Sequence, residues 1–208
     1  MEPVQNIPKE VGNMPKIILA TTSPYRIEAF EFLGIDFQAE GSKVDESQAE
    51  RKEPEKLVEA LSRMKAEAVA KNHKDSIVIG MDSVAYFEGR ILEKPESRED
   101  DFERLKALSG KQHRFFTGIF MVNTDTGREN TAVVMTEIFF RQISEKEINQ
   151  YLDSDTHFNT YALGYDPLQH ISSSFIRKIE GSYNNIIRGI PLEVVIEMLH
   201  DMGIESGN

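Results

Sequence analysis

Hydroxyl and basic side chains that could bind a phosphate come together in the segment Thr21-Thr-Ser-Pro-Tyr-Arg26. The segment follows a short apolar run, and Ser23 and Pro24 are typical of an N-cap and a first helical residue. A helix N-terminus offers unpaired N–H groups and a partial positive charge to an anion, and Arg26 could add a bidentate contact. The same pattern is also typical of a helix cap that binds nothing, so both interpretations stay open on the pattern alone.

Acidic side chains suited to a metal or to proton transfer occur at two places. We expect Asp82 just past the end of an apolar strand over 76–80, where groups that bind ligands in α/β sheets tend to lie. A carboxylate there could hold a divalent cation or act as a general base, or it could simply cap a turn. The adjacent Asp45 and Glu46 suit a hydrated Mg²⁺ ion, unless they are part of a solvated charged run.

Two lysines could neutralise a phosphate. Lys65 falls on the apolar face of a helix predicted over 54–71, and Lys94 precedes Pro95 in a loop. A lysine on an apolar face can extend its charged end into a cleft, or along the surface to solvent. Lys94 taken alone is equally typical of an ordinary surface residue.

Composition excludes several classes of protein. The 208 residues include 24 basic and 35 acidic side chains, a net charge of −11, which argues against partners such as nucleic acid or an anionic membrane. The absence of cysteine excludes disulfides, thiolate nucleophiles and Cys-ligated zinc. The sequence has no Walker A loop, no Gly-x-Ser-x-Gly motif, no apolar run of about 20 residues and no signal-peptide h-region. We therefore expect a cytoplasmic protein.

Strand and helix patterns alternate irregularly along the chain, which predicts an α/β domain whose sheet contains antiparallel pairs. Residues 1–14 are expected to form a flexible N-terminal tail, and residues 15–204 a single domain. Strands are predicted over 16–20, 36–39, 76–80, 114–122, 131–141 and 172–179. Helices are predicted over 24–33, 54–71, 97–109, from a capping box at Ser144 and Glu147, and over 191–202, with a hairpin turn at 87–90.

Taken in order, several motifs resemble the Maf family of nucleoside triphosphate pyrophosphatases, from about Lys16 to Gly203. The motifs are Leu-Ala-Thr-Thr-Ser-Pro-Tyr-Arg26, Gly34-Ile-Asp-Phe37, Val44-Asp-Glu-Ser47, Leu61-Ser-Arg-Met-Lys-Ala66, Ile79-Gly-Met-Asp-Ser-Val84, Gly89-Arg-Ile-Leu-Glu-Lys-Pro95, Leu108-Ser-Gly110, Phe116-Thr-Gly118, Ile179-Glu-Gly-Ser-Tyr183 and Gly189-Ile-Pro-Leu192. One such motif would mean little, but the whole series in register makes an accidental match improbable.

The resemblance implies a fold and an activity. The fold would be a mixed twisted sheet flanked by helices, with two lobes around a cleft, as in the inosine-triphosphate pyrophosphatase architecture. The activity would be hydrolysis of a nucleoside triphosphate to monophosphate and pyrophosphate, which removes non-standard or surplus nucleotides. It would use a divalent metal cation, Mg²⁺ in the first place, with Mn²⁺ and Co²⁺ as alternatives. The resemblance also makes a homodimer plausible.

The resemblance further implies roles for individual residues. Asp82 matches the proton acceptor, and Glu46 with Asp45 and Asp82 would hold the metal. Ser23, Arg26, Lys65, Lys94 and Ser182 would contact phosphate.

Tyr25, Ser83 and Gln169 fall at positions that would select the nucleobase. Gln169 follows the branch that prefers dTTP, UTP or modified pyrimidine nucleotides, which we favour. The aromatic Tyr25 resembles the 7-methyl-GTP branch, which is the alternative. Residues 156–170 depart most from the family pattern, with Ala162 in place of a lysine and Asp166-Pro167 in place of a Tyr-x pair. A nucleotide-binding regulatory protein with weak or no catalysis is therefore a further alternative.

Overall fold

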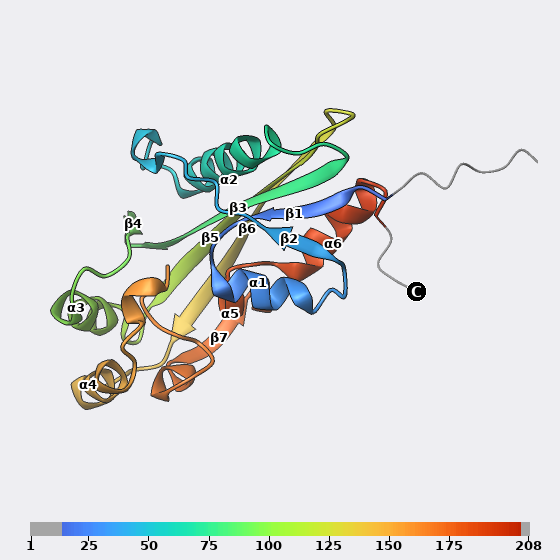
Figure 1. Ribbon diagram of the computed structural model, residues 1–208. Helices are drawn as coiled ribbons and strands as arrows, with labels where there is room; N and C mark the ends of the chain where they lie inside the picture. The colour runs from blue at the N-terminus through green and yellow to red at the C-terminus, as the bar shows by residue number, and fades with distance from the viewer. Residues whose placement is uncertain (1–13, 205–208) are drawn as a thin grey trace, which may run out of the picture.

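A seven-stranded mixed sheet forms the centre of the protein in the computed structural model, which describes residues 14–204 (Figure 1). The strands pair in the order β2-β1-β3-β5-β6-β7, and β4 pairs with β3 at one edge. They are β1 (Lys16–Ala20), β2 (Phe37–Ala39), β3 (Ser76–Phe87), β4 (Arg90–Leu92), β5 (Gln112–Asn123), β6 (Glu129–Phe140) and β7 (Ile176–Glu180). The predicted α/β class with antiparallel pairs is confirmed, since β2, β1 and β3 run parallel and the remaining pairs are antiparallel.

One edge of β3 has a notch in its strand pairing. β1 pairs with β3 as far as Ala20 opposite Gly80, and β4 pairs with it only from Ala85 onward. Residues 81–84 therefore face neither strand on that side. The expectation that the strand ends before Asp82 was wrong: β3 continues to Phe87 because β5 pairs with it from Ile77 to Tyr86. Asp82 thus lies inside a strand, just beyond the end of the neighbouring strand β1.

Helix α2 (Pro54–Ala70) covers one face of the sheet, as Figure 1 shows. Its backbone lies directly on two glycines of the central strands. A Cβ atom at Gly80 would lie 2.1 Å from the Ser62 carbonyl oxygen, and one at Gly118 would lie 2.2 Å from the Val58 carbonyl oxygen. Real Cβ atoms never approach a carbonyl oxygen so closely, so these two glycines fix the height of α2 above the sheet.

Two clusters of apolar side chains occupy the opposite face. At one end, α1 (Pro24–Glu31) and α6 (Leu192–Asp201) pack on the parallel strands, with Phe30 and Leu199 fully buried. At the other end, α3 (Arg98–Leu108) and α4 (Glu145–Ser154) enclose a second cluster. β3 and β5 run through both clusters, and these helices lie on the same side of the sheet in Figure 1.

Local signals predicted most helix ends well. Ser97 accepts a hydrogen bond from the Asp100 backbone N–H at the start of α3, and the capping box of Ser144 and Glu147 is formed in both directions. The hairpin at 87–90 is also confirmed, since Phe87 pairs with Arg90 across a turn in which Glu88 and Gly89 both have positive φ.

Two predictions near the C-terminus were wrong. Residues 171–174 form a 3-10 helix, and the strand begins only at Ile176. The hydroxyls of Ser172, Ser173 and Ser174 each donate to a carbonyl three residues earlier, and such local bonds compete with strand pairing. The separate helix α5 (Tyr183–Arg188), which Ser182 caps, was not predicted.

The expected tail falls largely outside the described residues, which begin at Met14. Among residues 14–204, no helix is long and apolar enough to cross a membrane.

Candidate active site

A cleft of about 1570 Å³ opens at the notch in β3. Its walls come from the segment after β1, the start of α1, the loop at residues 40–46, α2, β3, the segment after β4, the loop at residues 157–166 and the end of α5. Because β1 stops at Ala20 and β4 pairs only from Ala85, no strand pairs with residues 81–84 on this side, and Met81, Asp82 and Ser83 line the cleft. The gap in strand pairing is therefore what makes the site.

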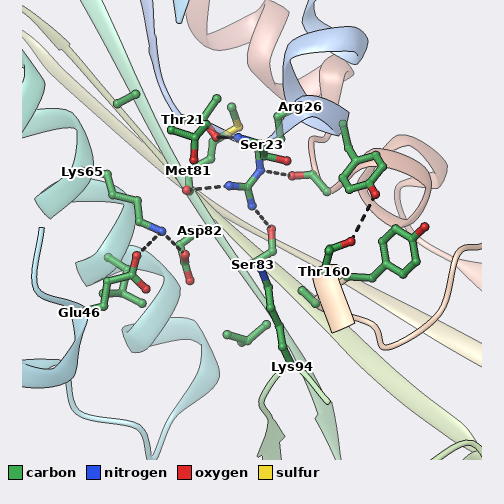
Figure 2. A pocket seen from close by; sticks show the side chains of 18 of the residues that line it. Thr21, Ser23, Arg26, Glu46, Lys65, Met81, Asp82, Ser83, Lys94 and Thr160 are labelled. Atoms are coloured by element: carbon green, nitrogen blue, oxygen red, sulfur yellow. Dashed lines mark hydrogen bonds and ion pairs between the residues drawn. The ribbon is translucent and has the colours of Figure 1, made fainter. Parts of the chain in front are cut away.

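Arg26 is fixed at the middle of the cleft by three hydrogen bonds (Figure 2). Its Nε donates to the Gly189 carbonyl at 3.0 Å, Nη1 to the Met81 carbonyl at 3.0 Å, and Nη2 to the Ser83 hydroxyl at 2.7 Å. Burial lowers the pKa of Arg26, and the nearby carboxylates of Asp82 and Glu46 oppose that shift. Each terminal nitrogen carries a second N–H, so the guanidinium can still donate to an anion.

Lys65 joins two carboxylates that are far apart in sequence. Its ammonium lies 2.5 Å from Asp82 Oδ1 and 2.9 Å from Glu46 Oε1. Lys65 comes from α2 and Asp82 from β3, and both side chains are mostly buried, whereas Glu46 is more exposed. The structure therefore brings these three predicted site residues together, and their roles toward a phosphate or a metal stay predictions.

The donor set at this point fits a hard cation. Glu46 and Asp82 both offer carboxylate oxygens to one positive group, and Mg²⁺ is usually bound through one or two carboxylates while it keeps several waters. Within residues 14–204, no group of three or more His, Asp or Glu side chains is placed to hold a metal by itself. Phosphate oxygens and waters would have to complete the coordination of a cation bound there.

Ser23 and Lys94 also line the cleft. Ser23 occupies the N-cap position of α1, but its side chain makes no capping bond, and its backbone N–H donates to Thr21 Oγ1 at 3.1 Å. The Ser23 hydroxyl is thus not used as a cap. Lys94 follows β4, and Figure 2 shows it below Ser83.

Three predicted site residues lie outside the cleft lining. Asp45 caps a 3-10 helix at Glu46–Gln48 through the Ser47 backbone N–H. Ser182 accepts a hydrogen bond from the Asn185 backbone N–H and caps α5. Gln169 is exposed, and its backbone N–H donates to the Asp166 carboxylate. The structure therefore gives the first two side chains a capping role and leaves the Gln169 side chain at the surface.

The divergent segment 156–170 contributes lining residues that sequence reasoning did not single out. They are His157, Thr160, Tyr161 and Leu163, and the cleft is also lined by Ala162 and Asp166, at which this chain departs from the family pattern. The Asp166 carboxylate accepts the backbone N–H groups of Leu168 and Gln169, a turn that the Asp-Pro dipeptide could have indicated. No local sequence signal indicates that Tyr161 lines the cleft, because the position of Tyr161 depends on how its loop packs against α4.

The net charge of the cleft lining is opposite in sign to the net charge of the whole chain. Among its described lining residues, six are basic and five are acidic, whereas the chain as a whole carries −11. The basic residues are Arg26, Lys43, Arg51, Lys65, Lys94 and Arg188, and the acidic ones are Glu40, Glu46, Asp82, Glu93 and Asp166. A small anion is therefore better accommodated in the cleft than on the outer surface.

Comparisons with known proteins find relatives over most of the chain. A dTTP/UTP pyrophosphatase of Syntrophus aciditrophicus is 39% identical over 188 residues, which cover 90% of each chain. A 7-methyl-GTP pyrophosphatase of Pseudomonas aeruginosa is 34% identical over 192 residues, 92% of this chain and 99% of that one. Among solved structures, the Staphylococcus aureus Ham1 protein matches with a TM-score of 0.51 at 17% identity, over 91% of this chain and 100% of that one, which supports the fold alone. The family model described as Maf-like protein matches residues 16–202, and with these full-length relatives it shows that the chain belongs to the Maf-like protein family.

Proposed function

We propose that the protein hydrolyses a nucleoside triphosphate to a nucleoside monophosphate and pyrophosphate in this cleft. The observation that carries the proposal is the meeting of Glu46, Lys65 and Asp82 beside the fixed guanidinium of Arg26. Phosphoryl transfer needs mainly positioning and charge neutralisation, and this group of residues supplies both. Family membership, with relatives named as pyrophosphatases, supports the same reaction.

In the proposed reaction, a water molecule attacks the α-phosphorus and the bond from this atom to the α–β bridging oxygen breaks. Asp82 accepts the proton of the attacking water, and pyrophosphate leaves with the bridging oxygen. Arg26 and Lys94 stabilise the charge on the phosphate oxygens, as does Lys65 after it leaves the carboxylates. Ser23 can donate a further hydrogen bond, because its hydroxyl is not used as a cap.

Glu46 and Asp82 would hold a divalent cation such as Mg²⁺, which supplies charge neutralisation at the polyphosphate. The two carboxylates already bind one positive group, the Lys65 ammonium, in the absence of substrate. With both carboxylates engaged by the cation instead, the Lys65 ammonium would be free to turn from Glu46 and Asp82 to a phosphate oxygen.

For the nucleobase we favour dTTP, UTP or modified pyrimidine nucleotides, with 7-methyl-GTP as the alternative. One of the two relatives compared above is named a dTTP/UTP pyrophosphatase and the other a 7-methyl-GTP pyrophosphatase. Family membership alone therefore does not identify the nucleobase. Tyr25 lines the cleft, and an aromatic face suits a cationic methylated purine as well as a neutral pyrimidine.

The test is a panel of UTP, dTTP, CTP, 7-methyl-GTP and the canonical purine triphosphates at equal concentration with Mg²⁺ or Mn²⁺. Products are separated so that pyrophosphate release is distinguished from release of single phosphates. We expect nucleoside monophosphate and pyrophosphate in equal amounts from at least one substrate. Release of orthophosphate alone, or no release from any substrate, would contradict the proposal.

A nucleotide-binding regulatory role is the second candidate. It is favoured because both cations already bind groups of the protein: the Arg26 guanidinium donates to two carbonyls and a hydroxyl, and the Lys65 ammonium pairs with two carboxylates. Calorimetry with the same panel separates the two functions: tight binding without turnover supports regulation, and rapid turnover excludes it.

A further inference from the structure

Two tyrosines from distant parts of the chain meet at the end of the cleft away from Glu46 and Asp82. Tyr25 lies on the first turn of α1, and Tyr161 lies on the loop that follows α4. Their ring centroids are 5.4 Å apart and their planes are inclined by 51°. The Tyr25 hydroxyl also lies 3.3 Å from the Thr160 hydroxyl. Both rings line the cleft and both are only partly buried, so they offer accessible aromatic surface to a ligand.

The loop that carries Tyr161 is fixed at both ends. The buried Tyr151 hydroxyl donates to Asp155 Oδ2 at 2.9 Å and accepts from the Asp166 backbone N–H at 3.1 Å. Asp155 Oδ1 also accepts the His157 backbone N–H at 2.8 Å. One buried side chain thus joins the beginning and the end of the loop, so the Tyr161 ring is positioned before any ligand arrives.

The phenol of Tyr161 stays neutral in this position. Burial raises its pKa well above the usual value, and hydrogen bonding to Tyr25 and the nearby charge of Asp155 add to the shift. A neutral ring bears no charge that would repel phosphate, and its face attracts flat or cationic groups.

The cleft therefore has two chemically different ends. Figure 2 shows Lys65, Glu46 and Asp82 on one side of Arg26 and Thr160 on the other. A nucleotide has the same polarity, since its charged polyphosphate and its flat base lie at opposite ends of the molecule. An inorganic polyphosphate would leave the aromatic end of the cleft unused.

We propose that Tyr161, together with Tyr25, forms the platform on which the nucleobase of the substrate stacks, which makes Tyr161 a base-binding residue that distinguishes a nucleotide from an inorganic polyphosphate. The inference rests on the proposed function and names the part of the substrate that the aromatic end recognises. The two rings touch, so no third ring fits between them, and the base packs on their exposed faces. Stacking tolerates different bases, and a cationic base binds more tightly than a neutral one.

The test measures binding without turnover. Calorimetry is done with the α,β-methylene analogue of UTP and with inorganic tripolyphosphate, each with Mg²⁺, on wild type, Tyr161→Ala, Tyr161→Leu and Tyr161→Phe. Tyr183→Ala serves as the matched control, because Tyr183 is 59% exposed and lies outside the cleft lining. The chain has six tyrosines and no tryptophan, so quenching of tyrosine emission gives a second readout of stacking.

We expect Tyr161→Ala and Tyr161→Leu to bind the nucleotide analogue about tenfold or more weakly, with reduced quenching and unchanged affinity for tripolyphosphate. Tyr161→Phe keeps the ring and is expected to bind within a few-fold of wild type. The inference is overturned if Tyr161→Leu binds the analogue as tightly as wild type, or if it loses affinity for both probes equally. A wild-type protein that stacks the analogue but releases no pyrophosphate from any triphosphate would contradict the proposed function and leave this inference intact.

Discussion

At the scale of single residues, Arg26 combines a structural role with a role in the site. Its three bonds join α1, β3 and the turn after α5, so one guanidinium connects three segments that line the cleft. A planar fork with five N–H donors is needed for this, and lysine cannot reproduce it.

We predict that Arg26→Lys loses both stability and activity. Three charge-assisted hydrogen bonds disappear from a buried position, so the free energy of unfolding should fall by about 1–3 kcal/mol. Pyrophosphate release should fall at least tenfold, because the cation moves away from the phosphates. Urea denaturation and a product assay measure the two effects, with the exposed Arg128→Lys as control. Retention of wild-type values for both quantities would show that the three bonds matter little.

At the scale of elements, the notch in β3 explains how much of the site the sequence could predict. The cap residues, the apolar runs and the family motifs located Arg26, Lys65 and Asp82, because each is tied to a local pattern. The end of β1 at Ala20 and the start of β4 pairing at Ala85 are properties of strand pairing between distant segments. Tyr161 was missed for the same reason, since its position depends on the buried Tyr151 and on two aspartates that hold the loop.

The two glycines under α2 give a prediction about the helix that carries Lys65. In Gly118→Ala, the new Cβ would lie 2.2 Å from the Val58 carbonyl oxygen, so α2 must move outward. We expect a loss of about 1–3 kcal/mol in the free energy of unfolding, and slower hydrolysis because Lys65 shifts relative to Asp82. Gly127→Ala is the control, because its added Cβ meets nothing within 4 Å and only the positive φ opposes it. Equal catalytic rates in the two variants would contradict this role of Gly118.

At the scale of the whole molecule, the long central strands connect the two apolar clusters. β3 contributes Ile77 and Ile79 to the cluster at the α1 end, and Ala85 to the one at the α3 end. We therefore propose that residues 15–204 unfold as one cooperative unit. The fully buried Tyr151 and Tyr165 report on the cluster at the α3 end by fluorescence, and far-UV circular dichroism reports on all elements. The two urea transitions should coincide, and an earlier loss of tyrosine signal would show that the two ends unfold separately.

Buried Asp101 makes the stability of the whole molecule depend on pH. Neither of its carboxylate oxygens has a hydrogen-bond partner within the described part of the chain, and burial raises its pKa from 3.8 to about 8, against the opposing charge of Arg104. The folded state therefore keeps a proton that the unfolded chain releases above about pH 4. This contribution to stability is complete below that pH and is lost as the pH rises to 8.

The window from pH 7.5 to 8.5 isolates the effect of Asp101. Burial lowers the pKa of His113 from 6.5 to about 3, and the ion pair with Arg141 lowers that of Glu147 to about 2, so both contributions are nearly constant about one pH unit or more above the pKa of an unfolded histidine. We expect the free energy of unfolding of wild type to fall across this window and that of Asp101→Asn to stay nearly level. The exposed Asp36→Asn should follow wild type. A wild-type value that does not change across the window would contradict the assignment.

If Asp82 accepts a proton in a pyrophosphatase reaction in this cleft, removing the basicity of its side chain must slow that reaction. Asp82→Asn keeps the shape of the side chain and removes its basicity. Single-turnover rates of pyrophosphate release are measured for wild type, for Asp82→Asn and for Asp201→Asn, an exposed residue at the end of α6. We predict a loss of about 10²–10⁴-fold in Asp82→Asn, with its fold retained, and no loss in Asp201→Asn. Undiminished release by Asp82→Asn would contradict this role of Asp82.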